Sequence, residues 1–272
     1  MIDGVSVAKA CRYLNISRQA YYQHCARSLK REAHEARVIQ FVHHERMIQP
    51  RIGTRKLQYL LALVKIDIGR DHLFNLLRER RLLVPTKRAY HKTTNSHHRF
   101  RCHPNLIKAG LKADKPNQLW VADITYLPTR TGESYVSLIT DAYSRKIVGY
   151  QVDDNMRTQS VKQAFTRALK QKSINEKLVH HSDRGIQYCS EEYQKLHRKH
   201  DVQCSMTDGY DCYQNALAER VNGILKNEYL LHKPRDLEEA RKMVAESVTI
   251  YNGRRPHLAL KYKTPDEIHR AF

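Results

Sequence analysis

The chain has 272 residues and is strongly basic, because 48 lysines and arginines outnumber 28 acidic residues and give a net charge of +20. A hydrophobic fraction of 41% is enough for a buried core, and the length suits one large domain with a smaller one. No apolar run reaches the roughly 18 residues of a membrane span, and no apolar stretch behind a basic start marks a secretory signal, so a membrane or exported protein is not expected.

The basic excess is concentrated in residues 1–114, as expected of a region that meets a polyanion such as DNA. A merely basic soluble protein or a ribosome-associated one has the same composition. Charge alone therefore indicates a nucleic-acid partner and no particular chemistry. The six cysteines form no Cys-x-x-Cys pair, which predicts no disulfide framework and indicates a reducing, cytoplasmic compartment.

Residues 1–90 predict a helical DNA-binding region that begins with a helix-turn-helix-like unit. Apolar residues recur at helical spacing from Val7 to Leu14, and the turn "NIS" follows. Ser17 is expected to cap a second, short helix that carries Arg18, a candidate DNA contact.

A second unit of the same kind follows a helix expected at 31–48. Helices are predicted at 53–64 and 70–84, each with a leucine stripe on one side. On the later helix, Arg70, Arg78 and Arg81 are candidate DNA contacts away from the leucines. A plain helical bundle with solvated arginines is the alternative interpretation.

A polar and basic linker is expected at 91–117, where prolines interrupt any periodic pattern. His97, His98, Cys102 and His103 suggest zinc. Structural zinc sites, however, pair their ligands in two separate knuckles, and no second knuckle follows. No zinc site is therefore expected in the linker.

From residue 118 to residue 272 the pattern changes to strands and helices. Strands are expected at 118–128, 135–143, 146–152, 177–182 and 202–206, with helices at 158–171, 190–200, 215–231 and 236–251. Three strands, helix, strand, helix, strand, helix is the order of the ribonuclease-H-like fold. The predicted class is therefore α/β, with a mixed five-stranded sheet flanked by helices and preceded by an all-α region.

Two aspartates lie where this fold would make them functional. Asp123 interrupts the otherwise apolar strand "WVADITYL", and a buried carboxylate there needs a cation or hydrogen-bond donors. Asp183, in "HSDRGIQY", follows the fourth strand, where open α/β sheets bind ligands. The simpler alternatives are an Asp123 satisfied by backbone donors and an Asp183 that only opens a surface turn.

A third acid, Glu219, lies on the helix "NALAERVNGILKNEY". It shares one face with Asn222 and Lys226, at positions i, i+3 and i+7. If that face meets the strand ends, three carboxylates converge. Such a cluster requires a hard divalent cation, and carboxylate oxygens suit Mg²⁺ or Mn²⁺.

With "DAYSRKIVGY" and "YNGRRPHLALKYKTP", these segments resemble the catalytic core of bacterial insertion-sequence transposases of the retroviral-integrase type. More narrowly, they resemble the second-reading-frame protein of two-frame insertion elements. Thirty-five residues separate Asp183 from Glu219, which is the spacing of that family's Asp-Asp-35-Glu signature. The resemblance extends over nearly the whole chain, since the paired helical units match the family's N-terminal region.

The resemblance implies that Asp123, Asp183 and Glu219 form a catalytic, metal-binding triad. Two Mg²⁺ or Mn²⁺ ions are expected in the DNA-bound state, serving displacement at phosphorus without a covalent protein–DNA intermediate. Lys226 matches a basic position that contacts terminal DNA. Gln214 and Tyr210 depart from the family pattern in the loop before the catalytic helix, which predicts a differently shaped loop.

The function expected is that of a transposase. It would bind the terminal inverted repeats of a mobile element and target DNA, and catalyse strand cleavage and transfer as a homo-oligomer in the bacterial cytoplasm, at the nucleoid when bound. Fusion or association with an upstream-frame helix-turn-helix protein is an open alternative for the complete enzyme. The rival functions are a non-enzymatic helix-turn-helix regulator and a nuclease for RNA–DNA hybrids.

Other polar residues near these motifs are expected to be structural. Asp141 should cap a turn, and Asp208 and Asp211 should be solvated. His180 and His181 are assigned a structural or phosphate-contact role, and Trp120 a place in the core. Glu228 lies on the same helix as Glu219 but off its face.

Overall fold

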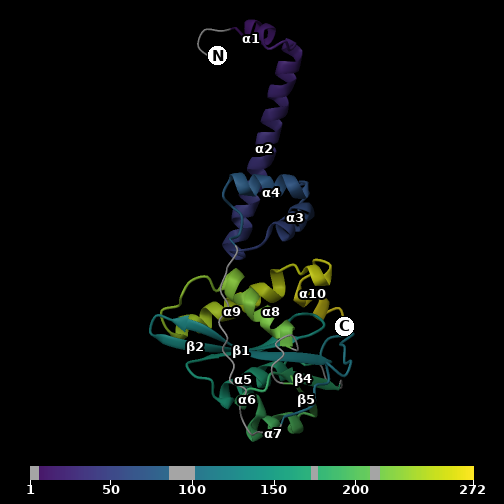
Figure 1. Cartoon of the computed structure of the whole chain (residues 1–272), viewed down its shortest axis with the longest axis vertical. Coiled ribbons are helices and arrows are strands. Elements are labelled where there is room, and N and C mark those ends of the chain that lie inside the picture. Colours follow the sequence, from purple (N-terminus) through teal and green to yellow (C-terminus); the bar gives the residue numbers. More distant parts are fainter. Residues whose placement is uncertain (1–5, 86–101, 173–176, 209–214) are drawn as a thin grey trace. The chain divides into compact units, whose positions relative to one another are not determined.

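The computed structural model describes residues 6–85, 102–172, 177–208 and 215–272. The chain divides into two compact units: a helical unit of residues 1–48 and 52–84, and a core unit of residues 49–51 and 85–272. Figure 1 labels the elements of each unit. Within the described ranges, no helix is long and apolar enough to cross a membrane.

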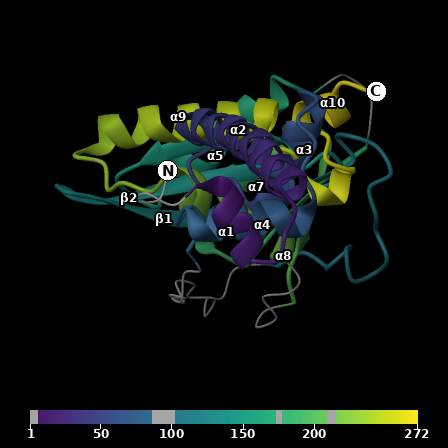
Figure 2. The ribbon, with the colours of Figure 1, turned by 90° about the horizontal axis from the view of Figure 1, so that it is seen from above.

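The helical unit begins with α1 (Val7–Tyr13), which folds back beside the first turns of α2 (Arg18–Ile48) (Figures 1 and 2). Ser17 caps α2 as predicted, since its Oγ accepts a hydrogen bond from the backbone N–H of Ala20 at 3.0 Å. The prediction of a short helix and a separate one at 31–48 is wrong, because α2 is one helix of 31 residues. No glycine or proline interrupts it, and polar side chains surround its first half.

The predicted helix pair is present as α3 (Thr54–Leu63) and α4 (Arg70–Glu79). α4 ends earlier than predicted because Arg81 adopts a left-handed backbone conformation, with φ of 55°. Arg81 therefore lies in the turn after the helix. The leucine stripes of both helices and the second half of α2 form one core, made of Val38, Val42, Ile52, Leu57, Leu61, Leu73, Leu76 and Leu77.

The core unit is built on a five-stranded sheet. Its strands are β1 (Leu119–Thr129), β2 (Gly132–Asp141), β3 (Ile147–Asp153), β4 (Leu178–Ser182) and β5 (Val202–Met206), in the order β3-β2-β1-β4-β5. The first three strands pair antiparallel, whereas β4 runs parallel to both β1 and β5. This is the mixed sheet that the order of the predicted elements requires.

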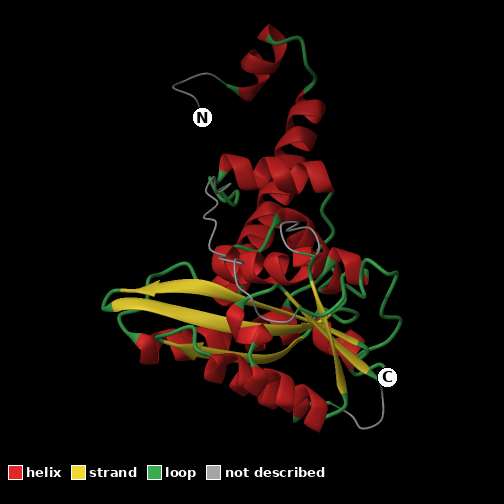
Figure 3. Cartoon of the chain, turned by 60° about the horizontal axis from the view of Figure 1, so that its bottom comes forward, coloured by secondary structure: helices red, strands yellow, loops and turns green. Residues whose placement is uncertain are grey.

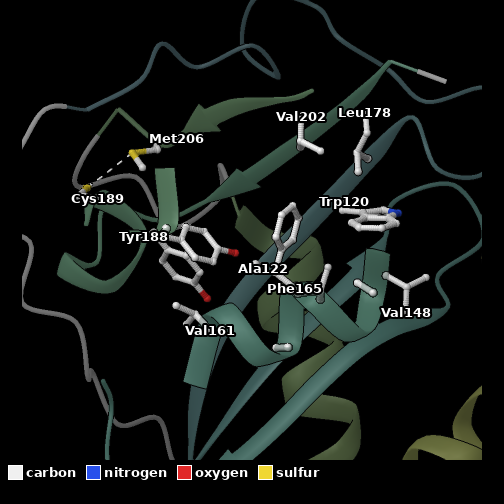
Figure 4. Packing of buried hydrophobic residues seen from close by; sticks show 14 residues of the cluster. Trp120, Ala122, Val148, Val161, Phe165, Leu178, Tyr188, Cys189, Val202 and Met206 are labelled. Carbon is white, nitrogen blue, oxygen red and sulfur yellow. Dashed lines mark hydrogen bonds between the residues drawn. The ribbon is translucent and has the colours of Figure 1, made fainter. Parts of the chain in front are cut away.

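Helices cover both faces of the sheet (Figures 1 and 3). One face packs against α5 (Thr158–Leu169), α6 (Ile186–Cys189) and α7 (Glu191–Lys199). Trp120 lies fully buried in this layer, as predicted, beside Phe165 (Figure 4). The helix predicted at 190–200 is present as α7, capped by Ser190, whereas the short α6 before it was not predicted.

The opposite face packs against α8 (Ala216–Ile224), a π-helix η2 (Leu225–Tyr229) and α9 (Leu237–Arg254). A short 3₁₀ turn η3 (Leu258–Leu260) and α10 (Pro265–His269) complete the unit. The helix predicted at 215–231 therefore changes to π-helical geometry at Leu225.

Gly149 explains how closely α5 approaches the sheet. A Cβ at this position of β3 would lie 2.3 Å from the backbone oxygen of Ala164 and 2.8 Å from the Cβ of Ala168. Only glycine leaves the backbones free to pack at this distance.

Candidate active site

Asp123 lies in the middle of β1 and faces α8. Side chains alternate between the two faces of a strand, so Trp120 and Ala122 point to the α5 side while Asp123 points to the other. Its Oδ1 accepts a hydrogen bond from the backbone N–H of Ile124 at 2.9 Å, and its Oδ2 accepts one from Asn222 Nδ2 at 2.7 Å. Asp123 therefore has donors for both carboxylate oxygens.

These donors do not offset the effect of burial on the pKa of Asp123. Burial raises the pKa of this carboxyl to about 7, and the negative charges of Asp183 and Glu219 contribute, although the hydrogen bonds from Asn222 and Ile124 act in the opposite direction. The ionised form is thus disfavoured unless a cation is added.

The parallel register of β1 and β4 brings Asp183 beside Asp123. Trp120 pairs with His180 and Val121 with His181, so continuing the register places Asp183 next to Asp123. β4 ends at Ser182, and Asp183 opens the predicted turn by accepting a hydrogen bond from the N–H of Gly185 at 3.0 Å. The two aspartates therefore come together where neighbouring parallel strands separate.

α8 is attached to β1 by two asparagines on one helix face. Asn215 Nδ2 donates to the carbonyl of Ala122 at 2.9 Å, and Asn222 Nδ2 donates to Asp123 two turns later. Glu219 lies between them in sequence, and its charge acts on Asp123. The sequence placed Asn222 on the face of Glu219, but nothing in it indicated that Asn222 binds Asp123.

The negative charges of Asp183 and Glu219 thus both act on Asp123. Across the described residues, no group of three or more His, Cys, Asp or Glu side chains is arranged to hold a metal ion. The donor set still fits Mg²⁺ or Mn²⁺, because it consists of carboxylate oxygens. A bound cation would also offset the burial and the negative charges that disfavour the ionised form of Asp123.

Lys226 is half-buried on η2, on the carboxylate side of the helix as its spacing predicts. Burial lowers the pKa of Lys226, and the charge of Asp123 opposes that shift. Two residues later, Glu228 is off this face and binds Arg255 through two hydrogen bonds of 2.8 and 2.6 Å. The sequence identified Glu228 as off the face but did not predict its partner.

Several residues set aside in the sequence are structural, as predicted. Asp141 caps the turn after β2: its Oδ1 accepts the N–H of Ser144 at 2.7 Å and its Oδ2 that of Asn117 at 2.7 Å. His180 and His181 are fully buried, which excludes phosphate contact, and they bond to Tyr193 and Ser205.

Asp208 pairs with Lys108 at 2.8 Å and is more constrained than the prediction of a solvated acid implied. Asp211, Tyr210, Gln214, His97 and His98 lie outside the described residues.

The predicted DNA contacts of the helical unit are all exposed. Arg18 and Arg70 begin α2 and α4, Arg78 lies over the ring of Phe74, and Arg81 follows α4. Arg70 forms an exposed ion pair with Asp71 at 2.8 Å. An exposed pair of this kind contributes little to stability, so Arg70 remains available to bind a polyanion.

A pocket of about 190 Å³ lies at the two aspartates and is lined by residues of both faces of β1. Its described lining residues are Asp123, Ile124, Thr125, Tyr126, Met156, Asp183, Gly185, Ile186, Gln187 and Tyr188. No pattern in the sequence pointed to this pocket, because its walls come from β1, the β3–α5 loop and α6.

Comparison with known proteins gives concordant results. Residues 113–212 match the integrase core domain family, and residues 200–265 match a second family with the same description. The chain is 36% identical to the insertion element IS600 uncharacterized 31 kDa protein of Shigella sonnei, over 94% of this chain and 95% of that protein. It is 32% identical to the putative transposase for insertion sequence element IS986/IS6110 of Mycobacterium tuberculosis, over 81% of this chain and 82% of that one.

A cryo-electron-microscopy structure also resembles the chain, that of the simian T-cell lymphotropic virus intasome in complex with PP2A regulatory subunit B56 gamma. The TM-score is 0.50 at 16% identity, over 86% of this chain and 74% of that chain. This likeness supports the fold assignment.

Proposed function

Because the chain belongs to the bacterial insertion-sequence transposases with an integrase core, and is thus a polynucleotidyl transferase of DNA transposition and integration, we propose that it binds its element's terminal inverted repeats and cleaves and joins the strand ends. One observation carries the proposal. The charges of Asp183, in the turn after β4, and of Glu219, on α8, both act on Asp123 in the central strand β1.

Integrase-type core domains generally use divalent metal ions. In this chain Asp123, Asp183 and Glu219 would hold Mg²⁺ or Mn²⁺, with two ions expected on DNA. When bound, the metal supplies activation of the attacking oxygen and stabilisation of the leaving oxygen at the phosphate. The chain's own residues fix the geometry: β1 holds Asp123, the turn at Gly185 holds Asp183, and the two asparagines of α8 hold the helix that carries Glu219.

Lys226 is proposed to contact the phosphates of the element end, because it is a cation beside the acidic cluster. Arg18, Arg70, Arg78 and Arg81 are proposed to bind DNA through the helical unit, and two element ends would be held by a homo-oligomer. The transposase relatives favour the enzyme over a non-catalytic regulator. No feature of the described residues favours a nuclease for RNA–DNA hybrids.

The test uses a pre-nicked inverted-repeat substrate, on which Mg²⁺-dependent strand transfer is followed on a gel. Asp183→Asn removes one carboxylate charge but keeps the shape of the side chain, so transfer should be lost while binding of the repeat in a mobility-shift assay is unchanged. Asp208→Asn, outside the acidic cluster, is the matched control and should transfer normally. Undiminished transfer by Asp183→Asn would remove the acidic cluster from the chemistry.

A further inference from the structure

The pocket beside β1 is unlike the acidic cluster that it adjoins. Alternation along β1 turns Ile124 and Tyr126 toward the α5 side, whereas Asp123 turns toward α8. Met156 and Ile186 complete its apolar surface from the β3–α5 loop and from α6. The pocket thus has apolar walls beside the two aspartates that also line it.

The apolar part of the pocket offers no cation to a phosphate. Among the described lining residues there is no lysine, arginine or histidine, in a protein whose net charge is +20. A phosphate beside Asp123 and Asp183 would be held by the metal ions that these residues are proposed to bind. The apolar walls therefore suit a neutral group next to that phosphate.

The apolar surface is open to solvent. Met156 is 42% exposed and Ile186 is 49% exposed, so both side chains offer apolar surface to a ligand. Tyr126 adds a half-buried aromatic ring. An apolar surface that includes an aromatic ring and a thioether suits a flat heterocycle, which stacks on such groups.

The walls are fixed before any ligand binds. Gln187 Nε2 donates to the carbonyl of Met156 at 2.7 Å and ties α6 to the β3–α5 loop. The ring of Tyr126 packs against Tyr135, with centroids 5.0 Å apart. Gly185 leaves room for two lining side chains, because a Cβ there would lie 3.1 Å from Asp183 Oδ1 and 3.2 Å from Gln187 Oε1. A preformed pocket avoids the ordering entropy that weakens binding.

We propose that this pocket, formed by Ile124, Tyr126, Met156, Ile186 and Gln187, binds a single nucleobase that leaves the stack beside the reacting phosphate. The inference rests on the proposed function, because DNA must lie at the acidic cluster. A volume of about 190 Å³ admits one base and not a base pair. The edge of the base would face Gln187, whose Oε1 can accept a hydrogen bond while its Nε2 donates to Met156.

A protein–DNA double-mutant cycle tests this proposal. Abasic sites are placed one at a time near the joining point, in the element end in one arm and in target DNA in the other. Affinity is measured in Ca²⁺ for the wild type and for Met156→Ala/Ile186→Ala. Leu258→Ala is the control, because Leu258 is an exposed apolar residue of the same unit away from the pocket.

At one position the missing base should weaken binding by the wild type and by Leu258→Ala by about tenfold, yet leave the double variant almost unaffected, because that variant has already lost the stacking surface. The arm in which this occurs identifies the strand. If no position in either arm shows coupling while the wild type still transfers strands of intact DNA, the pocket proposal is wrong. If the wild type transfers no strand, the proposed function itself fails.

Discussion

Asn222 hydrogen-bonds Asp123, the acid whose pKa burial raises. Its Nδ2 donates to Asp123 Oδ2 at 2.7 Å and opposes the rise in the pKa of that carboxyl. Hydrogen bonds of this kind orient a ligating carboxylate and favour its charged form. We therefore propose Asn222 as a positioning residue, which acts through Asp123 if Asp123 binds the metal.

Asn222→Ala should lower the strand-transfer rate by about 10- to 100-fold and raise the Mg²⁺ concentration needed for half-maximal rate. The physical reason is that Asp123 loses the donor that favours its ionised, metal-binding form. The measurement is a Mg²⁺ titration of strand transfer.

Asn252→Ala provides the matched control for this prediction. Asn252 is also a buried asparagine, but it bonds both backbone groups of Ile147 at 2.9 Å. Its removal should reduce stability and leave the Mg²⁺ requirement unchanged. Equal Mg²⁺ curves for wild type and Asn222→Ala would contradict the positioning role.

At the scale of elements, one buried ion pair joins η2 to the residues after α9. Arg255 and Glu228 form two hydrogen bonds, and their side chains are only 6% and 21% exposed. Arg255 also contacts His257 and lies over the ring of Tyr251. The pair therefore fixes the π-helix that carries Lys226.

Arg255→Met should lower the free energy of unfolding by on the order of 3 kcal/mol, because Glu228 keeps a poorly solvated charge without its partner. Glu228→Met/Arg255→Met should be less destabilised than the single variant, since no charge is then left behind. Urea unfolding followed by the fluorescence of Trp120, the only tryptophan, measures the core unit. Arg198→Met, in the exposed pair with Glu191, is the control and should change stability little.

Elements were predictable from sequence where the signal is local. The periodicity of apolar residues placed the five strands and most helices, and Ser17 marked the start of α2. The length of α2 was not predicted, because a helix that is polar on all sides for half its length lacks an amphipathic pattern. The π-helix at Leu225 was not predicted, and neither was the partner of its Glu228, since Arg255 comes from a distant segment.

The candidate site divides in the same way. An aspartate within an apolar strand, another after a strand, and a glutamate sharing a helix face can be recognised in the sequence. Asp123, Asp183 and Glu219 were therefore predicted together, and in the structure the charges of the latter two act on Asp123. The hydrogen bonds of Asn215 and Asn222 and the apolar pocket depend on distant segments meeting. Such partners are set by the packing of the whole molecule and leave no local pattern.

At the scale of the whole molecule, the core unit depends on histidines that are buried without charge. His197 is 1% exposed and stacks on Phe165, with centroids 4.3 Å apart. Burial lowers the pKa of His197 from 6.5 to about 4, and burial lowers that of neighbouring His180 well below 6.5. Both rings are therefore neutral in the folded protein at neutral pH.

The sign of the pH dependence follows from these lowered values. Below pH 6.5 His197 is protonated in the unfolded chain, whereas in the folded chain it stays neutral down to about pH 4. The contribution of neutral His197 to the free energy of unfolding is therefore complete above pH 6.5 and is lost as the pH falls. At pH 5 the loss from His197 is on the order of 2 kcal/mol.

His197→Phe should keep the stack on Phe165 and reduce the difference in stability between pH 7 and pH 5 by about that amount. The measurement is urea unfolding at both pH values, followed through Trp120. Exposed His232→Gln should retain the wild-type difference, and an equal difference in His197→Phe would show that His197 is not the group that destabilises the core unit in acid.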